Sequence, residues 1–132
     1  MSDPDGAHVS HLHEVYTSPD WRRPLPGTLD ALATLRGLSV RLHLVSNSSD
    51  MLLESLSRLG WDRLFEAVTF SQEVGAEKPD KRVFDLALKR AGCGPEDVVH
   101  VGDSLTADDL GARGTGLRAI WFNRGGSPPP EP

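Results

Sequence analysis

Apolar residues follow two alternating spacings along the middle of this chain. In some segments they return every three or four positions, as along Leu29, Leu32 and Leu35, which predicts an amphipathic helix. In others they form short continuous runs, as from Val40 to Val45, which predicts a strand. Glycines follow several of the helical segments, as expected for helix ends. The predicted helices cover residues 27–37, 51–59, 83–92 and 106–113, and the predicted strands cover residues 40–45, 65–70, 98–101 and 118–122.

This alternation of helices and strands predicts the fold class. The connections are short, except for a predicted loop from Ser71 to Pro79, and several strands are continuous apolar runs. Such a pattern is typical of a parallel sheet with helices on both faces, so we expect an α/β, Rossmann-like domain. His43 and His100 fall inside predicted strands, which favours packed, hydrogen-bonded roles over catalysis.

We expect three parts along the chain. Residues 1–26 form an N-terminal segment with a short helix near residues 7–16 and a proline-rich, extended connection. Residues 27–124 form the α/β core. Residues 125–132 are rich in glycine and proline, and we expect a disordered tail there.

Composition excludes several classes of function. The net charge of −5 gives no basic surface for nucleic acid or anionic membranes. The chain has no apolar run near the roughly 18 residues of a membrane span, and its single cysteine, Cys93, excludes a disulfide framework. His8, His11 and His13 lack a cysteine or carboxylate at metal-ligand spacing, so we interpret them as solvated. A soluble, cytoplasmic protein is the simplest expectation.

The segment from Val98 to Ala112 carries the densest candidate chemistry. An apolar strand breaks at Gly102 and is followed by three acids, Asp103, Asp108 and Asp109, within seven positions. Oxygen donors at a strand end suit Mg²⁺, which proteins hold through one or two carboxylates. Asp109 is better explained as a helix-capping partner of Thr106. Both interpretations remain open for Asp108, whereas capping explains Asp103 less well.

Two further loops fall at the same edge of the predicted sheet. Parallel strands present their carboxyl ends on one side, so the loops with Ser46 and Asn47, with Lys78, and with Asp103 and Asp108 should lie close together. A hydroxyl, an amide, a lysine and two carboxylates are the groups needed to grip a phosphate and its Mg²⁺. Taken singly, the serines could be a helix cap and the lysine a solvated surface residue.

Residues 14–124 resemble the haloacid dehalogenase superfamily of phosphatases and related hydrolases. The resemblance rests on LVSNSS (residues 44–49), GAEKPDKRVFDLAL (75–88) and HVGDSLTADDLGARGTG (100–116). It implies that Ser46 binds the transferred phosphoryl group, that Lys78 neutralises it, and that Asp103 with Asp108 holds Mg²⁺. It also implies hydrolysis of a small phosphate monoester through an aspartyl-phosphate intermediate.

The chain departs from the family at its first motif. Family members begin with an apolar strand that ends in Asp-x-Asp, and here the one such pair is Asp3 and Asp5, with no strand before it. A terminal carboxylate without packed support is a poor nucleophile. The chain therefore resembles the carboxyl-terminal part of a longer enzyme without the central strand. We expect a marginally stable fold that uses a complementing chain or a dimer.

Two other functions fit the same pattern. The first is a non-catalytic remnant or binding module that keeps the scaffold and some affinity for anions. The second is a 2-haloacid dehalogenase, which attacks carbon and needs no metal, although Asp103 and Asp108 favour phosphate chemistry. The substrate's identity is not encoded in a recognisable motif.

Overall fold

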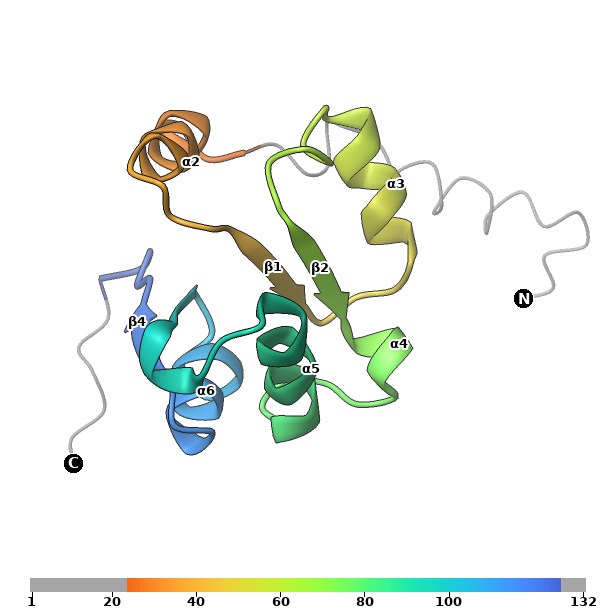
Figure 1. The fold of residues 1–132 in the computed structure, drawn as a ribbon, viewed down its shortest axis with the longest axis vertical. Coiled ribbons are helices and arrows are strands. Elements are labelled where there is room, and N and C mark those ends of the chain that lie inside the picture. Colours follow the sequence, from red (N-terminus) through yellow and green to blue (C-terminus); the bar gives the residue numbers. More distant parts are fainter. Residues whose placement is uncertain (1–23, 127–132) are drawn as a thin grey trace, which may run out of the picture.

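A computed structural model describes residues 24–126 (Figure 1). Helices and short parallel strands alternate along the chain, as the apolar spacing predicts. The helices are α2 (Thr28–Gly37), α3 (Met51–Arg58), α4 (Ser71–Val74), α5 (Lys81–Ala91) and α6 (Gly111–Gly114), with a 3₁₀ turn η1 (Pro95–Asp97) and a π-helical turn η2 (Leu105–Leu110). The strands are β1 (His43–Ser46), β2 (Ala67–Phe70), β3 (Val99–Gly102) and β4 (Arg118–Trp121).

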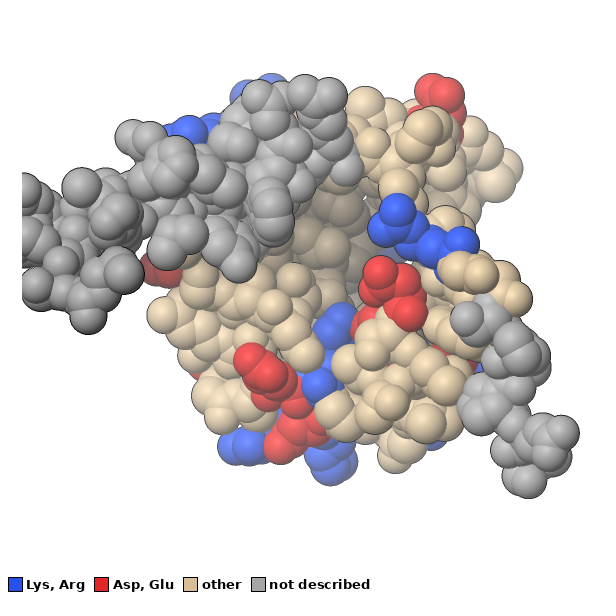
Figure 2. Space-filling model, turned by 180° about the vertical axis from the view of Figure 1, so that it is seen from behind, with Lys and Arg blue, Asp and Glu red and all other residues tan. Residues whose placement is uncertain are grey.

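The strands form two separate parallel pairs rather than one sheet. β1 pairs with β2 from His43 opposite Ala67 onward, and β3 pairs with β4 from Val99 opposite Arg118 onward. Within the described residues no ladder joins β1 to β3, and no strand lies between them. The prediction that the strands run parallel is confirmed. The sheet is interrupted between β1 and β3, which is where the family resemblance implied that the central strand is missing. The face shown in Figure 2 is hollowed near its centre, with an uncharged floor.

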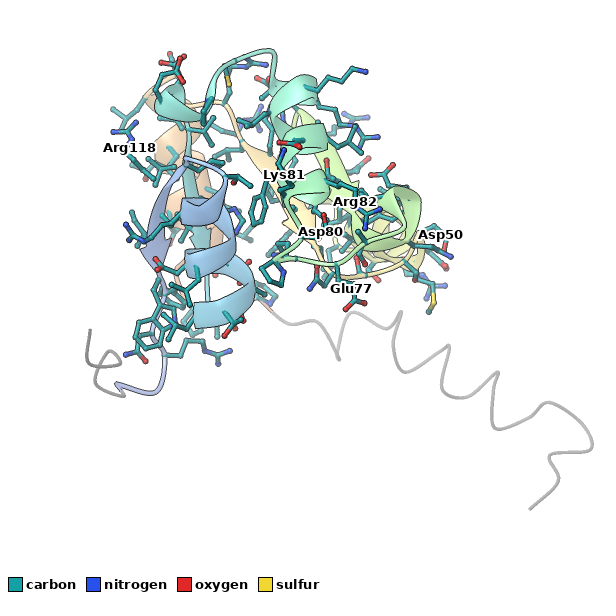
Figure 3. The ribbon with its side chains drawn as sticks, turned by 90° about the horizontal axis from the view of Figure 1, so that it is seen from below. Asp50, Glu77, Asp80, Lys81, Arg82 and Arg118 are labelled. Atoms are coloured by element: carbon teal, nitrogen blue, oxygen red, sulfur yellow. The ribbon has the colours of Figure 1, made fainter. Side chains whose placement is uncertain are left out.

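Helix α5 packs against the strands and carries the main core residues. Val83 and Phe84 are fully buried, and burying a side chain such as Phe84 stabilises the fold by about 1.5–3 kcal/mol. The helix begins after Asp80, whose carboxylate accepts from the backbone N–H and the guanidinium of Arg82 (Figure 3). These hydrogen bonds, led by the guanidinium, lower the pKa of Asp80 to about 2. Gly92 ends the helix with a left-handed φ of 65°.

Two elements differ from their prediction. The segment predicted as a loop starts with α4, because the Glu73 carboxylate accepts from the Phe70 N–H and closes a helical turn. The helix predicted over 106–113 is instead η2 followed by α6. The Ser104 carbonyl accepts from the N–H groups of both Asp108 and Asp109, which widens the turn to the π type.

Large apolar side chains remain on the surface beside the strand pairs. α2 buries none of its residues, and the exposed apolar side chains on it and on the strands β3 and β4 include Leu29, Leu35, Val99, Val101 and Ile120. Residues 24–126 contain no helix that is long and apolar enough to cross a membrane. The predictions for residues 1–23, including the short helix and the three histidines, lie outside the described part, as does most of the predicted tail.

Candidate active site

Lys78 and Asp108 form a buried ion pair at the carboxyl ends of β1 and β3. Lys78 Nζ lies 2.5 Å from Asp108 Oδ1, and the two side chains are 9% and 7% exposed. The same ammonium group donates to the Val45 carbonyl at 3.1 Å. Lys78 is therefore fixed between the two strand pairs, in contrast to the solvated surface lysine that was the alternative.

The Asp108 carboxylate is held by three donors. Oδ1 contacts Lys78 Nζ and, at 3.0 Å, His100 Nε2, while Oδ2 accepts from the Ser104 N–H at 3.0 Å. Burial, the largest single influence, raises the pKa of Asp108, but these hydrogen bonds together outweigh it and leave the pKa below the usual range. The carboxyl group lies directly over Gly102, where any Cβ would overlap it. Glycine at this strand end therefore makes room for the carboxylate.

Asn47 joins the loop after β1 to the Lys78 loop. Its Nδ2 donates to the Lys78 carbonyl at 3.1 Å, and its Oδ1 accepts from the Lys78 N–H at 2.7 Å. Both ends of the amide are engaged with backbone, so Asn47 positions Lys78. Ser46, the last residue of β1, is half-buried, and its hydroxyl makes no hydrogen bond within residues 24–126.

Asp103 presents the exposed carboxylate of the site. It follows Gly102 at the end of β3, and its carbonyl accepts from Trp121 Nε1 at 3.1 Å. In the described part of the chain its carboxylate takes part in no ion pair. The next residue, Ser104, donates its N–H to Asp108, which ties the Asp103 loop to the buried pair. Asp103 is therefore free to bind a cation or a ligand.

The donor chemistry here fits a hydrated Mg²⁺ ion. No three His, Cys, Asp or Glu side chains converge within residues 24–126, so a complete protein cage is not formed there. Mg²⁺ keeps several waters and is usually bound through one or two carboxylates and substrate phosphate. The exposed Asp103 would supply one such carboxylate, whereas the oxygens of Asp108 already accept from Lys78, His100 and the Ser104 N–H.

Three further side chains have contacts that the sequence did not fully predict. His100, expected to be packed and hydrogen-bonded, is confirmed in that role, with its ring edge-on to Phe84 at 5.3 Å, but its contact with Asp108 was not foreseen. The ring nitrogens of His43 are buried without a hydrogen bond among the described residues, so that half of its prediction is wrong. Asp109 does not cap with Thr106; it pairs with Arg113, since the Ser104 hydroxyl accepts from Ala107 N–H and caps the turn itself. Asp3 and Asp5 lie outside the described part.

Comparison with known proteins identifies the class. The family model for haloacid dehalogenase-like hydrolases matches residues 3–116. The chain is 43% identical over 102 residues to a glyceraldehyde 3-phosphate phosphatase of Methanothermobacter thermautotrophicus, covering 76% of this chain and 45% of that protein. It is 42% identical over 117 residues to a phosphoserine phosphatase of Thermus thermophilus, covering 86% of this chain and 47% of that protein.

A solved structure agrees with this assignment. The HAD phosphatase from Thermococcus onnurineus superposes with a TM-score of 0.83 at 30% identity, covering 89% of this chain and 55% of that one. The chain belongs to the haloacid dehalogenase-like hydrolase family, and its fold corresponds to part of the α/β core. It spans about half the length of the curated relatives it matches.

Proposed function

We propose that this chain supplies the phosphate-binding part of a Mg²⁺-dependent phosphatase that acts on small phosphate monoesters. The observation that carries the proposal is the buried pair of Lys78 and Asp108 beside the exposed Asp103. An ammonium group has three donors, and two of those on Lys78 are engaged by Asp108 and Val45. The third remains for a phosphoryl oxygen.

The remaining site residues have distinct roles in this proposal. Asn47 holds the Lys78 backbone in place, and the free Ser46 hydroxyl donates to the phosphoryl group. Asp103, with Asp108, would hold Mg²⁺, which when bound neutralises charge on the phosphoryl oxygens. The substrate class follows from the names of the relatives, which act on glyceraldehyde 3-phosphate and on phosphoserine.

The reaction needs an attacking carboxylate in addition to these residues. A carboxylate oxygen would bond to phosphorus while the bond to the ester oxygen breaks, and the alcohol would leave with a proton from an acid. Water would then split the acyl phosphate into carboxylate and inorganic phosphate. Three sources of this carboxylate fit the proposal: Asp3, with Asp5 as acid and base; another chain, such as a complementing chain or a second copy; or a segment upstream of this sequence.

Hydrolysis of p-nitrophenyl phosphate by the 132-residue chain tests the proposal. If Asp3 or a second copy of the chain supplies the attacking carboxylate, we expect turnover with Mg²⁺ that is lost in EDTA and in Asp103→Asn, while the exposed carboxylate variant Asp62→Asn keeps it. Turnover that survives Asp3→Asn would exclude Asp3 as the nucleophile. Equal rates for Asp103→Asn and the wild type would contradict the proposed site.

A binding scaffold without turnover is the second candidate. It is favoured by one observation: within residues 24–126 Asp108 is paired with Lys78, so that if Asp103 holds Mg²⁺ the site has no carboxylate left to attack phosphorus. A folded sample that binds phosphate through Lys78 but shows no hydrolysis would support this function.

A further inference from the structure

His100 contacts the candidate site from inside strand β3. Exposure alternates along this strand, so His100 and Gly102 lie on the same, less exposed face. The Asp108 carboxyl group lies over this face at Gly102, where a Cβ would overlap it. From two residues back along the strand, His100 Nε2 reaches Asp108 Oδ1 at 3.0 Å. The glycine thus makes room for the carboxylate, and the histidine holds it.

The hydrophobic core fixes the orientation of the His100 ring. The side chain is 11% exposed, and its ring lies edge-on to Phe84, with 5.3 Å between the ring centroids and 88° between the ring planes. Phe84 is itself fully buried in the cluster with Ala112 and Leu117. Because the imidazole is packed against this cluster, its Nε2 stays directed at the Asp108 carboxylate.

This contact determines where the ammonium group of Lys78 lies. A carboxylate oxygen accepts, so His100 Nε2 donates to Asp108 Oδ1, which also accepts from Lys78 Nζ. The other oxygen, Oδ2, accepts from the Ser104 N–H, so the carboxyl group is held at both ends. Lys78 Nζ is held in turn between Oδ1 and the Val45 carbonyl. The direction of the remaining donor of Lys78 therefore depends on the hydrogen bond from His100.

We propose that His100 is a positioning residue of the phosphate site, which acts through Asp108 to direct the third N–H of Lys78 at a phosphoryl oxygen. This inference rests on the proposed phosphate-binding role of Lys78. His100 does not itself touch the phosphate. Its role differs from that of a core histidine, because an apolar side chain of similar size would replace the packing but not the hydrogen bond.

His43 provides a matched control. It is also a strand histidine, its side chain is 16% exposed, and its ring nitrogens make no hydrogen bond among the described residues. Glu66 Oε2 lies 3.7 Å from its Nε2, which is beyond hydrogen-bond reach. His43→Leu therefore removes a largely buried imidazole without removing a hydrogen bond to Asp108.

The first measurement needs no phosphate. Two-dimensional ¹H–¹⁵N NMR of the full chain reports the Lys78 ammonium group, whose signal is identified by its loss in Lys78→Met. We expect His100→Leu to shift this signal, because Asp108 Oδ1 loses one of its two donors. His100→Gln supplies an amide N–H in place of Nε2–H and should keep the signal near its wild-type position, as should His43→Leu. An unshifted signal in folded His100→Leu, or equal shifts in the two leucine variants, would overturn the proposal.

A measurement on the histidine ring applies even where His100→Leu does not fold. The ring nitrogens of His100 are assigned by their absence from the spectrum of His100→Gln. We expect the proton on Nε2, and we expect Lys78→Met to shift this nitrogen, since both side chains donate to the same oxygen of Asp108. A neutral ring with its proton on Nδ1, or an Nε2 signal that is unchanged in Lys78→Met, would overturn the proposal.

Calorimetry with inorganic phosphate distinguishes this inference from the proposed function. We expect wild type, His100→Gln and His43→Leu to bind phosphate with similar affinity, and His100→Leu to bind it about tenfold more weakly. Unchanged affinity in folded His100→Leu would overturn the role of His100 and leave the proposed function intact. A wild type that binds no phosphate, although His100→Leu shifts the Lys78 signal, would refute the proposed function and still support the placement of Lys78 by His100.

Discussion

The same substitution, Asp to Asn, is expected to destabilise the fold strongly at Asp108 and hardly at all at Asp103. Both are acids of the candidate site, but Asp108 is 7% exposed in its side chain and is paired with Lys78, whereas Asp103 is exposed. Asp108→Asn leaves the ammonium group of Lys78 buried without a counter-charge. Asp103→Asn removes a charge that water already solvates.

The structure sets the size of each effect. Breaking a buried ion pair by removing one partner costs about 3–5 kcal/mol, and the amide retains an oxygen for the Ser104 N–H, which favours the lower end. We therefore expect Asp108→Asn to reduce the free energy of unfolding by about 3 kcal/mol and Tm by roughly 10–20 °C. Asp103→Asn should change the free energy of unfolding by less than about 0.5 kcal/mol.

Urea and thermal unfolding followed by circular dichroism measure both effects. The double variant Lys78→Met with Asp108→Asn removes both charges and should recover part of the lost stability, since an uncharged pair has no buried charge to compensate. Equal stability of the two single variants, or a double variant less stable than Asp108→Asn, would refute the assignment of Lys78 and Asp108 as a buried pair.

Three further substitutions probe contacts around the site. Gly102→Ala should displace the Asp108 carboxyl group and cost about 1–3 kcal/mol in urea unfolding. Glu73→Gln breaks a bidentate pair with Arg90, whose hydrogen bond is the main cause of the lowered pKa of Glu73. The pair stabilises the fold fully above the ordinary pKa of 4.5 and loses this effect as pH falls through the lowered pKa. Wild type and variant should therefore differ by up to about 1 kcal/mol at about pH 7 and converge once the pH is below the lowered pKa of Glu73. Asn47→Ala removes two hydrogen bonds between loops and should cost about 1–2 kcal/mol in the same assay while weakening inorganic phosphate binding in calorimetry.

Each of these expectations has a definite contrary outcome. A Gly102→Ala protein as stable as the wild type would show that Asp108 has room to move. A Glu73→Gln difference that stays constant with pH would assign its effect to packing rather than charge. Unchanged phosphate affinity in Asn47→Ala would remove that residue from the proposed site.

Periodicity and parallel topology explain most of what could be foreseen. The spacing of apolar residues predicted the ends of every described strand to within about three positions. A short apolar run bounded by polar turns fits a buried strand better than a helix, which is longer. Parallel strands end at one edge, so the loops with Asn47, Lys78, Asp103 and Asp108 were expected to meet there. The structure brings the Lys78 and Asn47 loops together and places Lys78 against Asp108.

The contacts that depend on tertiary geometry could not be foreseen in the same way. The residues around Asn47 do not predict that its side chain hydrogen-bonds to the backbone of Lys78, 31 positions away. The π-helical turn forms because the Ser104 carbonyl accepts hydrogen bonds from two N–H groups. The spacing of apolar residues along a helix does not reveal such a hydrogen-bond pattern. Strand pairing is likewise non-local, so residue spacing did not show which strands pair. Only the family resemblance indicated that a central strand is missing between β1 and β3.

The placement of α5 has a consequence for how the molecule unfolds. The helix contacts β1 and β2 and, through Phe84, the cluster that contains Ala112 and Leu117 next to β3 and β4. A two-stranded sheet is at best marginally stable alone, so each strand pair depends on this shared helix. Loosening of α5 would release both halves in one step. Together with the Lys78–Asp108 pair, this eleven-residue helix therefore couples the unfolding of the two strand pairs.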